Sequence, residues 1–295
     1  MKIGLIDVDS HNFPNLALMK ISAYHKALGD NVSMYEPLFN NDCEKIYISK
    51  IFSFTPDIQY VFCDNVIKGG SGYDLSVTLP EEIDNIYPDY SLYNIKDTAY
   101  GYLTRGCFRN CAFCIVSKKE GIKTKQIYKL NQFYKNQKII KLLDPNITAA
   151  ANCIDLFNEL SETGALVDFT QGLDLRLLTD EKIEAVKKIK LKMIHFAWDK
   201  IEDEKIICER LSVFMNETKY NYHKVSVYIL VNFNTTFEQD LHRVYKIRDM
   251  GASPYIMIYE KEKAAKKYCH LQRYVNAMPI FRTIKTFDEY KRKSV

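Results

Sequence analysis

Six apolar segments alternate with helical segments over most of the chain, and no other feature constrains the fold as strongly. The apolar segments are rich in β-branched and aromatic residues, and several are apolar on both faces, as in a parallel sheet covered by helices. Strands that are separated by helices pair in parallel through right-handed crossovers. We therefore expect the α/β class, with a partial (β/α)6 barrel of parallel strands preceded by a small α/β N-terminal domain. The expected strands are residues 99–104, 138–144, 166–170, 192–198, 224–231 and 253–259, and the expected helices lie around residues 124–135, 148–163, 179–190, 201–218 and 235–250.

The N-terminal domain is predicted from a strand and a helix near the start of the chain. A strand over residues 2–8 precedes Pro14, which is suited to open a helix that Gly29 ends. Glycine and proline residues between positions 68 and 93 predict a loop-dominated connection to the barrel. Further short strands are expected at residues 31–35, 45–49 and 58–62. The expected domains are residues 1–92, the barrel core over residues 93–260, and a charged helical cap over residues 261–295.

The composition predicts a soluble cytoplasmic protein. Hydrophobic residues make up 47% of the chain and charged residues 26%, and no window approaches the roughly eighteen apolar residues of a membrane span. Eight cysteines are few for a secreted disulfide scaffold, and a reducing compartment keeps thiols available to metals. The net charge of +4 is uneven, because residues 105–141 hold ten Lys or Arg residues and one acidic residue, Glu120. Such a stretch either attracts an anionic substrate or is a solvated helix face.

Three cysteines are closely spaced in the pattern C-x-x-x-C-x-x-C: Cys107, Cys111 and Cys114. Thiolates select iron–sulfur clusters, zinc or copper(I). Structural zinc takes four ligands, and a 4Fe–4S cluster normally takes four cysteines, so three local thiolates would leave one iron open for chemistry. Nearby arginines, Arg105 and Arg109, suit an anionic cluster. The alternative is a zinc site completed by a distant Cys or His, in a non-catalytic zinc-stabilised nucleic-acid-binding protein whose lysines contact phosphate.

Two glycines flank the start of the cysteine motif. Gly101 and Gly106 are expected to let the backbone bend around a metal. The motif follows the first expected barrel strand, and in such barrels the loops at the carboxyl ends of the strands carry the chemistry. The cysteines are therefore predicted to lie at the functional end of the sheet.

The cysteine motif, with Phe113 immediately before its last cysteine, resembles the radical S-adenosylmethionine superfamily over roughly residues 98–260. The resemblance implies that the three cysteines bind a 4Fe–4S cluster and that S-adenosylmethionine occupies the fourth iron. It further implies reductive cleavage to methionine and a 5′-deoxyadenosyl radical, which abstracts hydrogen from a substrate that the sequence does not identify. A reductant such as flavodoxin or ferredoxin is the implied partner, and the backbone at Phe113 would approach the adenine.

Polar residues after the other strands are further candidates. The segment LLDPNIT is similar to the acidic motif of the branch near the cobalamin-associated and methylthiotransferase members, which implies that Asp144 accepts the methionyl amino group with help from Asn146. A helix cap or turn is the alternative role for Asp144. Arg176 could pair with a carboxylate bidentately, or could form a structural ion pair with Asp174. The remaining candidates at strand ends are Gln171, Asp199, Asn232 and Asn234.

Other features are expected to lie outside the chemistry. Asp9, Ser10 and His11 begin like the cobalamin signature D-x-H-x-x-G but do not complete it. The N-terminal domain therefore resembles a truncated cobalamin-binding fold for which no corrinoid is expected, and His11 is expected to cap a helix or lie in a loop. His195 lies in an apolar strand and is expected to be a core histidine with its hydrogen bonds satisfied. A second cluster has no support in the spacing of Cys43, Cys63, Cys153, Cys208 and Cys269.

Overall fold

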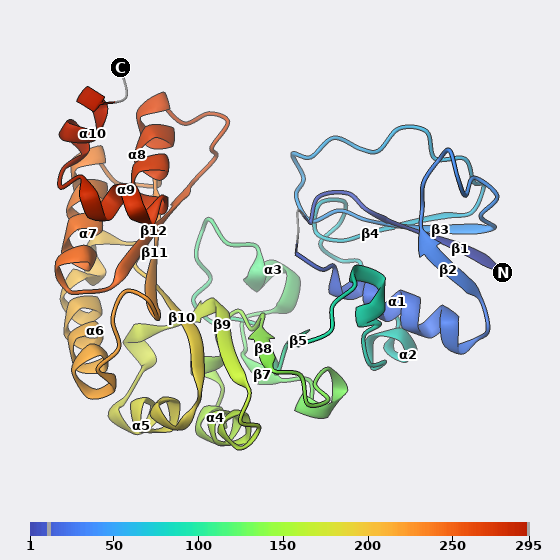
Figure 1. The fold of residues 1–295 in the computed structure, drawn as a ribbon, viewed down its shortest axis with the longest axis horizontal. Helices are drawn as coiled ribbons and strands as arrows, with labels where there is room; N and C mark the ends of the chain where they lie inside the picture. Colours follow the sequence, from blue (N-terminus) through green and yellow to red (C-terminus); the bar gives the residue numbers. More distant parts are fainter. Residues whose placement is uncertain (11–12, 294–295) are drawn as a thin grey trace. The chain divides into compact units, whose positions relative to one another are not determined.

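The computed structural model describes residues 1–10 and 13–293, and the chain divides into two compact units (Figure 1). The first unit comprises residues 1–101, 118–120 and 128–140, and the second comprises residues 102–117, 121–127 and those from 141 onward. His11 lies outside the described residues, so the role predicted for it stays a prediction. No helix in the described part of the chain is long and apolar enough to cross a membrane.

The first unit is built on a four-stranded parallel sheet in the order β2-β1-β3-β4. Ile3 and Leu5 of the first strand pack against Leu18 of the helix α1 (Leu16–Ala27). The helix begins at Asn15, whose side chain accepts a hydrogen bond from the Leu18 N–H, so the helix predicted after Pro14 is confirmed. The strands are β1 (Lys2–Asp7), β2 (Asn31–Met34), β3 (Lys45–Ser49) and β4 (Val66–Gly69).

The prediction of a strand at residues 58–62 is wrong, because the fourth strand of this sheet is β4, at Val66–Gly69. Tyr60 has a φ of 64°, in the left-handed region that an extended strand does not use. Tyr60 and Phe62 are also 70% and 57% exposed, so the segment does not bury the apolar residues that suggested a strand. The connection that follows β4 contains only the short helices α2 (Glu81–Asp84) and η1 (Tyr90–Tyr93).

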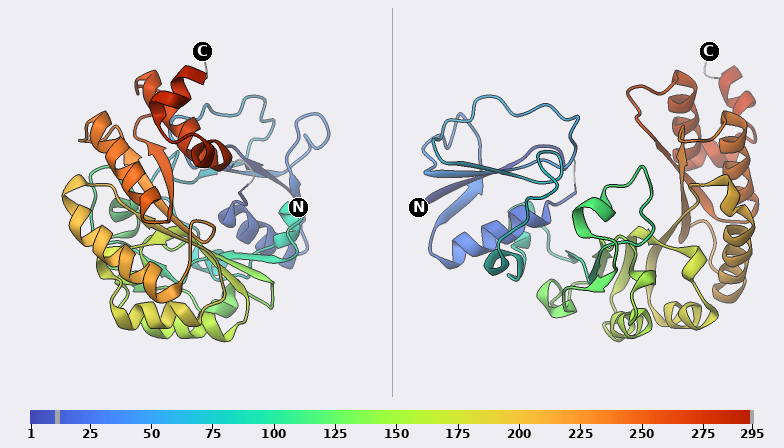
Figure 2. Two further views of the ribbon diagram at one scale, coloured as in Figure 1. Left: turned by 60° about the vertical axis from the view of Figure 1, so that its left-hand side comes forward. Right: turned by 180° about the vertical axis from the view of Figure 1, so that it is seen from behind.

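The six strands expected between residues 99 and 259 are confirmed as one parallel sheet in the order β12-β11-β10-β9-β8-β5. Strands that neighbour each other in this sheet also follow each other among the six expected strands, which is the arrangement that helical crossovers produce. The α/β class is confirmed. Helices α4 to α7 line one side of the sheet (Figures 1 and 2). The strands are β5 (Thr98–Gly101), β8 (Ile139–Leu142), β9 (Leu166–Leu173), β10 (Leu191–Ala197), β11 (Val225–Val231) and β12 (Ser253–Ile258), and the helices are α4 (Cys153–Glu162), α5 (Asp180–Lys188), α6 (Glu204–Thr218) and α7 (Phe237–Asp249).

The helix expected around residues 124–135 is wrong. Its first residues form strand β7 (Lys125–Gln126), which pairs antiparallel with β6 (Thr104–Arg105). The Ile127 N–H donates to the Leu103 carbonyl, so this stretch pairs with the segment before the cysteines and does not bond to itself as a helix does. Only one short 3₁₀ turn follows, η2 (Leu130–Gln132). Between the two strands lies a short helix that was not predicted, α3 (Val116–Glu120).

The C-terminal segment is helical, as predicted. Its described part forms α8 (Lys266–Asn276), α9 (Met278–Thr283) and α10 (Phe287–Lys293). The side-chain oxygen of Asn276 accepts a hydrogen bond from the Ile256 N–H at 2.8 Å, which ties α8 to β12. Tyr274 packs against Phe281 and Phe287, so the three helices share an aromatic core.

Candidate functional site

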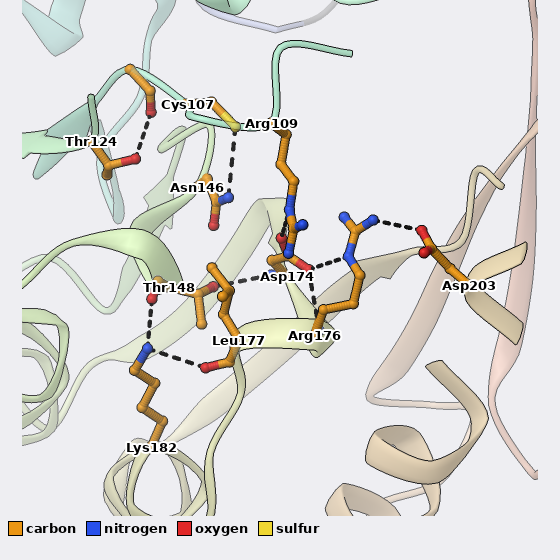
Figure 3. Close-up of polar contacts among 11 residues, drawn as sticks. Cys107, Arg109, Thr124, Asn146, Thr148, Asp174, Arg176, Leu177, Lys182 and Asp203 are labelled. Atoms are coloured by element: carbon orange, nitrogen blue, oxygen red, sulfur yellow. Dashed lines mark hydrogen bonds and ion pairs between the residues drawn. The ribbon is translucent and has the colours of Figure 1, made fainter. Parts of the chain in front are cut away.

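The three predicted cysteine ligands lie in a loop that the β6–β7 stem closes. The Thr124 hydroxyl donates to the Gly106 carbonyl at 3.1 Å, immediately before the loop (Figure 3). Gly106 has a φ of 88°, and a Cβ atom there would lie 2.2 Å from the Lys123 carbonyl oxygen. Glycine is the residue that tolerates both conditions. The bend predicted at Gly106 is therefore confirmed, and it directs the chain into Cys107.

Cys107, Cys111 and Cys114 form no disulfide and are partly exposed. The Cys107 N–H donates to the Gly121 carbonyl at 3.1 Å, and the Cys114 N–H donates to the Cys111 carbonyl at 2.9 Å. Burial raises the pKa of the Cys111 thiol, and the negative charges of Asp199 and of the other two cysteines raise it further. Positive charge, such as that of a bound metal, would favour the Cys111 thiolate.

A single metal ion would need ligands that converge on one point. Among the residues that the structure describes, no three His, Cys, Asp or Glu side chains form such a group. This finding concerns a single ion, because a 4Fe–4S cluster bonds each thiolate to a different iron.

Asp144 follows β8 and is bonded to the backbone that leads into the cysteine loop. Its buried carboxylate accepts hydrogen bonds from the Leu103 N–H at 3.1 Å and from the Thr104 hydroxyl at 2.6 Å, and it also accepts one from the Thr104 N–H. Burial outweighs these donors and raises the pKa of Asp144 to about 6. Asp144 therefore positions the start of the loop, while its predicted contact with a methionyl amino group stays a prediction.

Asn146 lies beside the first cysteine. Its Nδ2 atom donates to the Cys107 sulfur at 3.6 Å (Figure 3). The residue is 4% exposed, and its Oδ1 atom is buried with no hydrogen-bond partner in the described part of the chain. A buried polar atom without a partner costs about 1–3 kcal/mol, so it identifies a place where a ligand could donate a hydrogen bond. Asn146 thus offers an acceptor next to Cys107.

An ion-pair network joins the cysteine loop to the end of β9 (Figure 3). The Nε atoms of Arg109 and Arg176 donate to opposite oxygens of the Asp174 carboxylate at 2.7 Å and 2.8 Å. Arg176 also pairs with Asp203 at 2.7 Å. Burial raises the pKa of Asp174, but the two guanidinium groups lower it by more, so the net shift is downward. The structural ion pair between Asp174 and Arg176, one of the two roles predicted for Arg176, is confirmed.

Behind this network, a lysine fixes two loop carbonyls. Lys182 of α5 donates to the Thr148 carbonyl at 2.7 Å and to the Leu177 carbonyl at 3.1 Å (Figure 3). The Thr148 hydroxyl in turn accepts the Asp174 N–H at 3.0 Å. These residues were not predicted, because contacts to backbone carbonyls leave no pattern in a sequence.

The other predicted site residues lie at strand ends in different environments. Phe113 packs edge-on against Phe233 at 5.1 Å, so the cysteine loop contacts the segment that follows β11. Phe233 in turn packs against Tyr259, which follows β12, at 4.8 Å. Asp199 follows β10 and is partly buried, and this burial raises its pKa. Gln171 is exposed on β9. The structure thus places Phe113 and Asp199 by the cysteines, whereas it assigns no contact to Gln171.

Two expectations from the sequence are wrong. Gly101 lies in strand β5 without a positive φ, so it does not bend the backbone in a way that requires glycine. A Cβ atom there would lie 2.2 Å from the Phe133 ring, and the glycine makes room for that ring. His195 is not satisfied by hydrogen bonds, because its buried Nδ1 atom has no partner among the described residues. Its Nε2 atom lies 3.9 Å from the Asp168 carboxylate.

The sequence matches no family model, and a search of curated proteins finds no significant match.

Proposed function

We propose that this protein is a radical S-adenosylmethionine enzyme in which Cys107, Cys111 and Cys114 hold a 4Fe–4S cluster. The observation that carries the proposal is the buried, unpaired Oδ1 atom of Asn146 beside Cys107, in a loop that holds three cysteines outside any disulfide. When bound and reduced, the cluster supplies the electron that cleaves S-adenosylmethionine to methionine and a 5′-deoxyadenosyl radical, which abstracts hydrogen from the substrate. We further propose that the six-stranded sheet is a partial (β/α)6 barrel.

The residues around the loop have distinct roles in this proposal. The Asn146 amide donates to the Cys107 sulfur, which favours the thiolate, and its Oδ1 atom can accept the methionyl ammonium of S-adenosylmethionine. Asp174 holds Arg109 in the loop, where a cationic side chain favours an anionic cluster. Asp144 fixes the backbone before the first cysteine. We propose a cytoplasmic flavodoxin or ferredoxin as the electron donor, an anionic compound among the possible substrates, and no corrinoid.

Anaerobic reconstitution tests the proposal. The protein should take up about four irons per chain, the stoichiometry of one 4Fe–4S cluster, and should form 5′-deoxyadenosine from S-adenosylmethionine when dithionite is added. Cys111→Ala should lose both properties. Cys208→Ala is the matched control, because Cys208 is also a partly buried free thiol in the same unit and should be dispensable.

Two results would overturn the proposal. One is full S-adenosylmethionine cleavage by Cys111→Ala. The other is a purified protein that contains zinc and takes up no iron, and that result would favour the zinc-stabilised nucleic-acid-binding alternative.

A further inference from the structure

The two faces of the six-stranded sheet differ in their chemistry. Side chains that point toward the helices are apolar and at most 2% exposed, and they include Val167, Phe169, Ile194, Phe196, Val225, Val227 and Ile229. The alternate positions of the same strands point to the other face. There, β9, β10 and β11 carry Asp168, His195 and Tyr228, and Tyr255 of β12 lies opposite Tyr228. This polar and aromatic row is not needed to pack the helices.

Contacts along the row hold the His195 ring in place. The imidazole stacks on the Tyr228 ring with centroids 4.7 Å apart and planes 5° apart. The Tyr228 hydroxyl donates to the Thr170 carbonyl at 2.8 Å, and the Thr170 hydroxyl donates to the Asp168 carboxylate at 3.2 Å. His195 therefore lies between a fixed aromatic ring and a fixed carboxylate.

The surroundings of the imidazole determine which nitrogen can accept a hydrogen bond. The Nε2 atom faces the Asp168 carboxylate at 3.9 Å, which favours the hydrogen on Nε2 and leaves Nδ1 as the acceptor. Burial lowers the pKa of His195, the Asp168 charge opposes this shift, and the Lys141 charge adds to it. Burial also raises the pKa of the neighbouring Tyr228 phenol, which therefore carries no charge at neutral pH. The ring is thus neutral at pH 7, with its buried Nδ1 atom unpaired among the described residues.

We propose that Asp168, His195 and Tyr228 form a binding site for the substrate, which donates a hydroxyl or amino hydrogen to the Nδ1 atom of His195. That the ligand is the enzyme's substrate rests on the proposed function, whereas the presence of a binding site rests only on the contacts of these residues in the sheet. Tyr255 is 45% exposed and packs edge-on against Tyr228 at 5.7 Å, so it provides apolar surface for the carbon frame of the ligand. The ligand class is therefore a small molecule that carries hydroxyl or amino groups.

The tautomer of His195 is the first test. Protein without a cluster is labelled with ¹⁵N-histidine, and the imidazole signals that disappear in His195→Asn identify the residue. At pH 7 we expect a neutral ring with its hydrogen on Nε2. A hydrogen on Nδ1, or a doubly protonated ring, would overturn the proposal because neither form accepts a hydrogen bond at Nδ1.

Ligand binding is the second test, and it also uses protein without a cluster, so that its failure is distinct from a failure of the radical chemistry. Binding of serine, ethanolamine, ribose, glucosamine and guanosine is measured by saturation-transfer NMR. We expect at least one to bind, and His195→Phe, which keeps the ring stacking, to weaken its Kd about tenfold, the effect of one lost hydrogen bond. His195→Asn, which keeps an acceptor near the Nδ1 position, should bind more tightly than His195→Phe.

The exposed His223 provides the control, since His223→Phe changes a histidine outside the row and should leave Kd unchanged. The proposal fails if no member of the panel binds, or if His195→Phe binds as tightly as the wild type while its thermal unfolding shows that it is folded.

Discussion

Replacing Gly106 with alanine tests whether one residue sets the backbone at the start of the cysteine loop. Its φ of 88° costs an L-residue about 1–2 kcal/mol. The new Cβ atom would also lie 2.2 Å from the Lys123 carbonyl oxygen, and moving packed atoms apart costs about 1–3 kcal/mol. The lower entropy of the unfolded alanine chain returns about 0.4–1 kcal/mol. We expect the free energy of unfolding to fall by about 1–4.6 kcal/mol.

Gly121→Ala is the matched control for this variant. Gly121 has a φ of 87°, yet no heavy atom lies within 4 Å of the position that its Cβ would occupy. The control lacks the collision, but its ψ of 171° lies in a region that is used almost only by glycine and that costs alanine about 1–3 kcal/mol, so we expect a net loss of about 0–2.6 kcal/mol. Equilibrium urea unfolding followed by circular dichroism measures both values, and a larger loss for Gly106→Ala reports the effect of the Lys123 carbonyl.

Iron uptake gives a second readout of the same pair. Because Gly106 immediately precedes Cys107, relieving the collision moves the first thiol, and Gly106→Ala should take up less iron than Gly121→Ala. The reasoning is refuted if the two variants lose the same free energy of unfolding and take up the same iron, since the Lys123 carbonyl would then not restrict the loop.

Three further substitutions have expected outcomes. Asp144→Asn removes a carboxyl whose pKa is about 6 in the folded state and 3.8 ordinarily, so its ionisation destabilises the fold as pH rises. Between pH 4 and 7 the free energy of unfolding of the variant should therefore rise by about 2.4 kcal/mol relative to wild type in urea melts, and a constant difference would contradict this. Asn146→Leu should weaken S-adenosylmethionine binding about tenfold in equilibrium dialysis while iron uptake persists, and unchanged affinity would remove Asn146 Oδ1 from the cofactor site. Arg243→Met leaves the fully buried Asp240 without its ion-pair partner, so the free energy of unfolding should fall by about 3–5 kcal/mol. An unchanged melting temperature would show that the pair does not stabilise the fold.

The six-stranded sheet could be predicted because its strands carry apolar residues that the structure buries, so that local pattern and tertiary burial agree. The two misassigned segments depend on distant partners. The strand expected at residues 58–62 fails at the left-handed backbone of Tyr60. The helix expected around residues 124–135 fails because Lys125 and Gln126 pair with residues about twenty positions earlier. The spacing of apolar residues in a sequence indicates neither a left-handed backbone position nor pairing with a distant segment.

Some features of the candidate site could likewise be predicted from the sequence, and others could not. The cysteine spacing and Gly106 are local features, and both were visible in the sequence. The contacts of Asp144 go to backbone groups about forty residues earlier, which no sequence pattern records. His195 was misjudged although a local signal existed. Ile194 and Phe196 are both fully buried on the helix-covered face, so the alternation of a strand places His195 on the opposite face.

The way in which the cysteine loop is held bears on the choice between a catalytic cluster and a structural zinc site. In a small zinc-stabilised module the metal supplies the folding free energy. Here the loop is fixed by the Asp144 carboxylate before it, by the Arg109–Asp174 ion pair within it, and by the β6–β7 stem that closes it. These contacts belong to a chain with its own buried hydrophobic residues. A loop whose thiols are positioned by surrounding side chains and strands is suited to keeping one metal position open for a ligand.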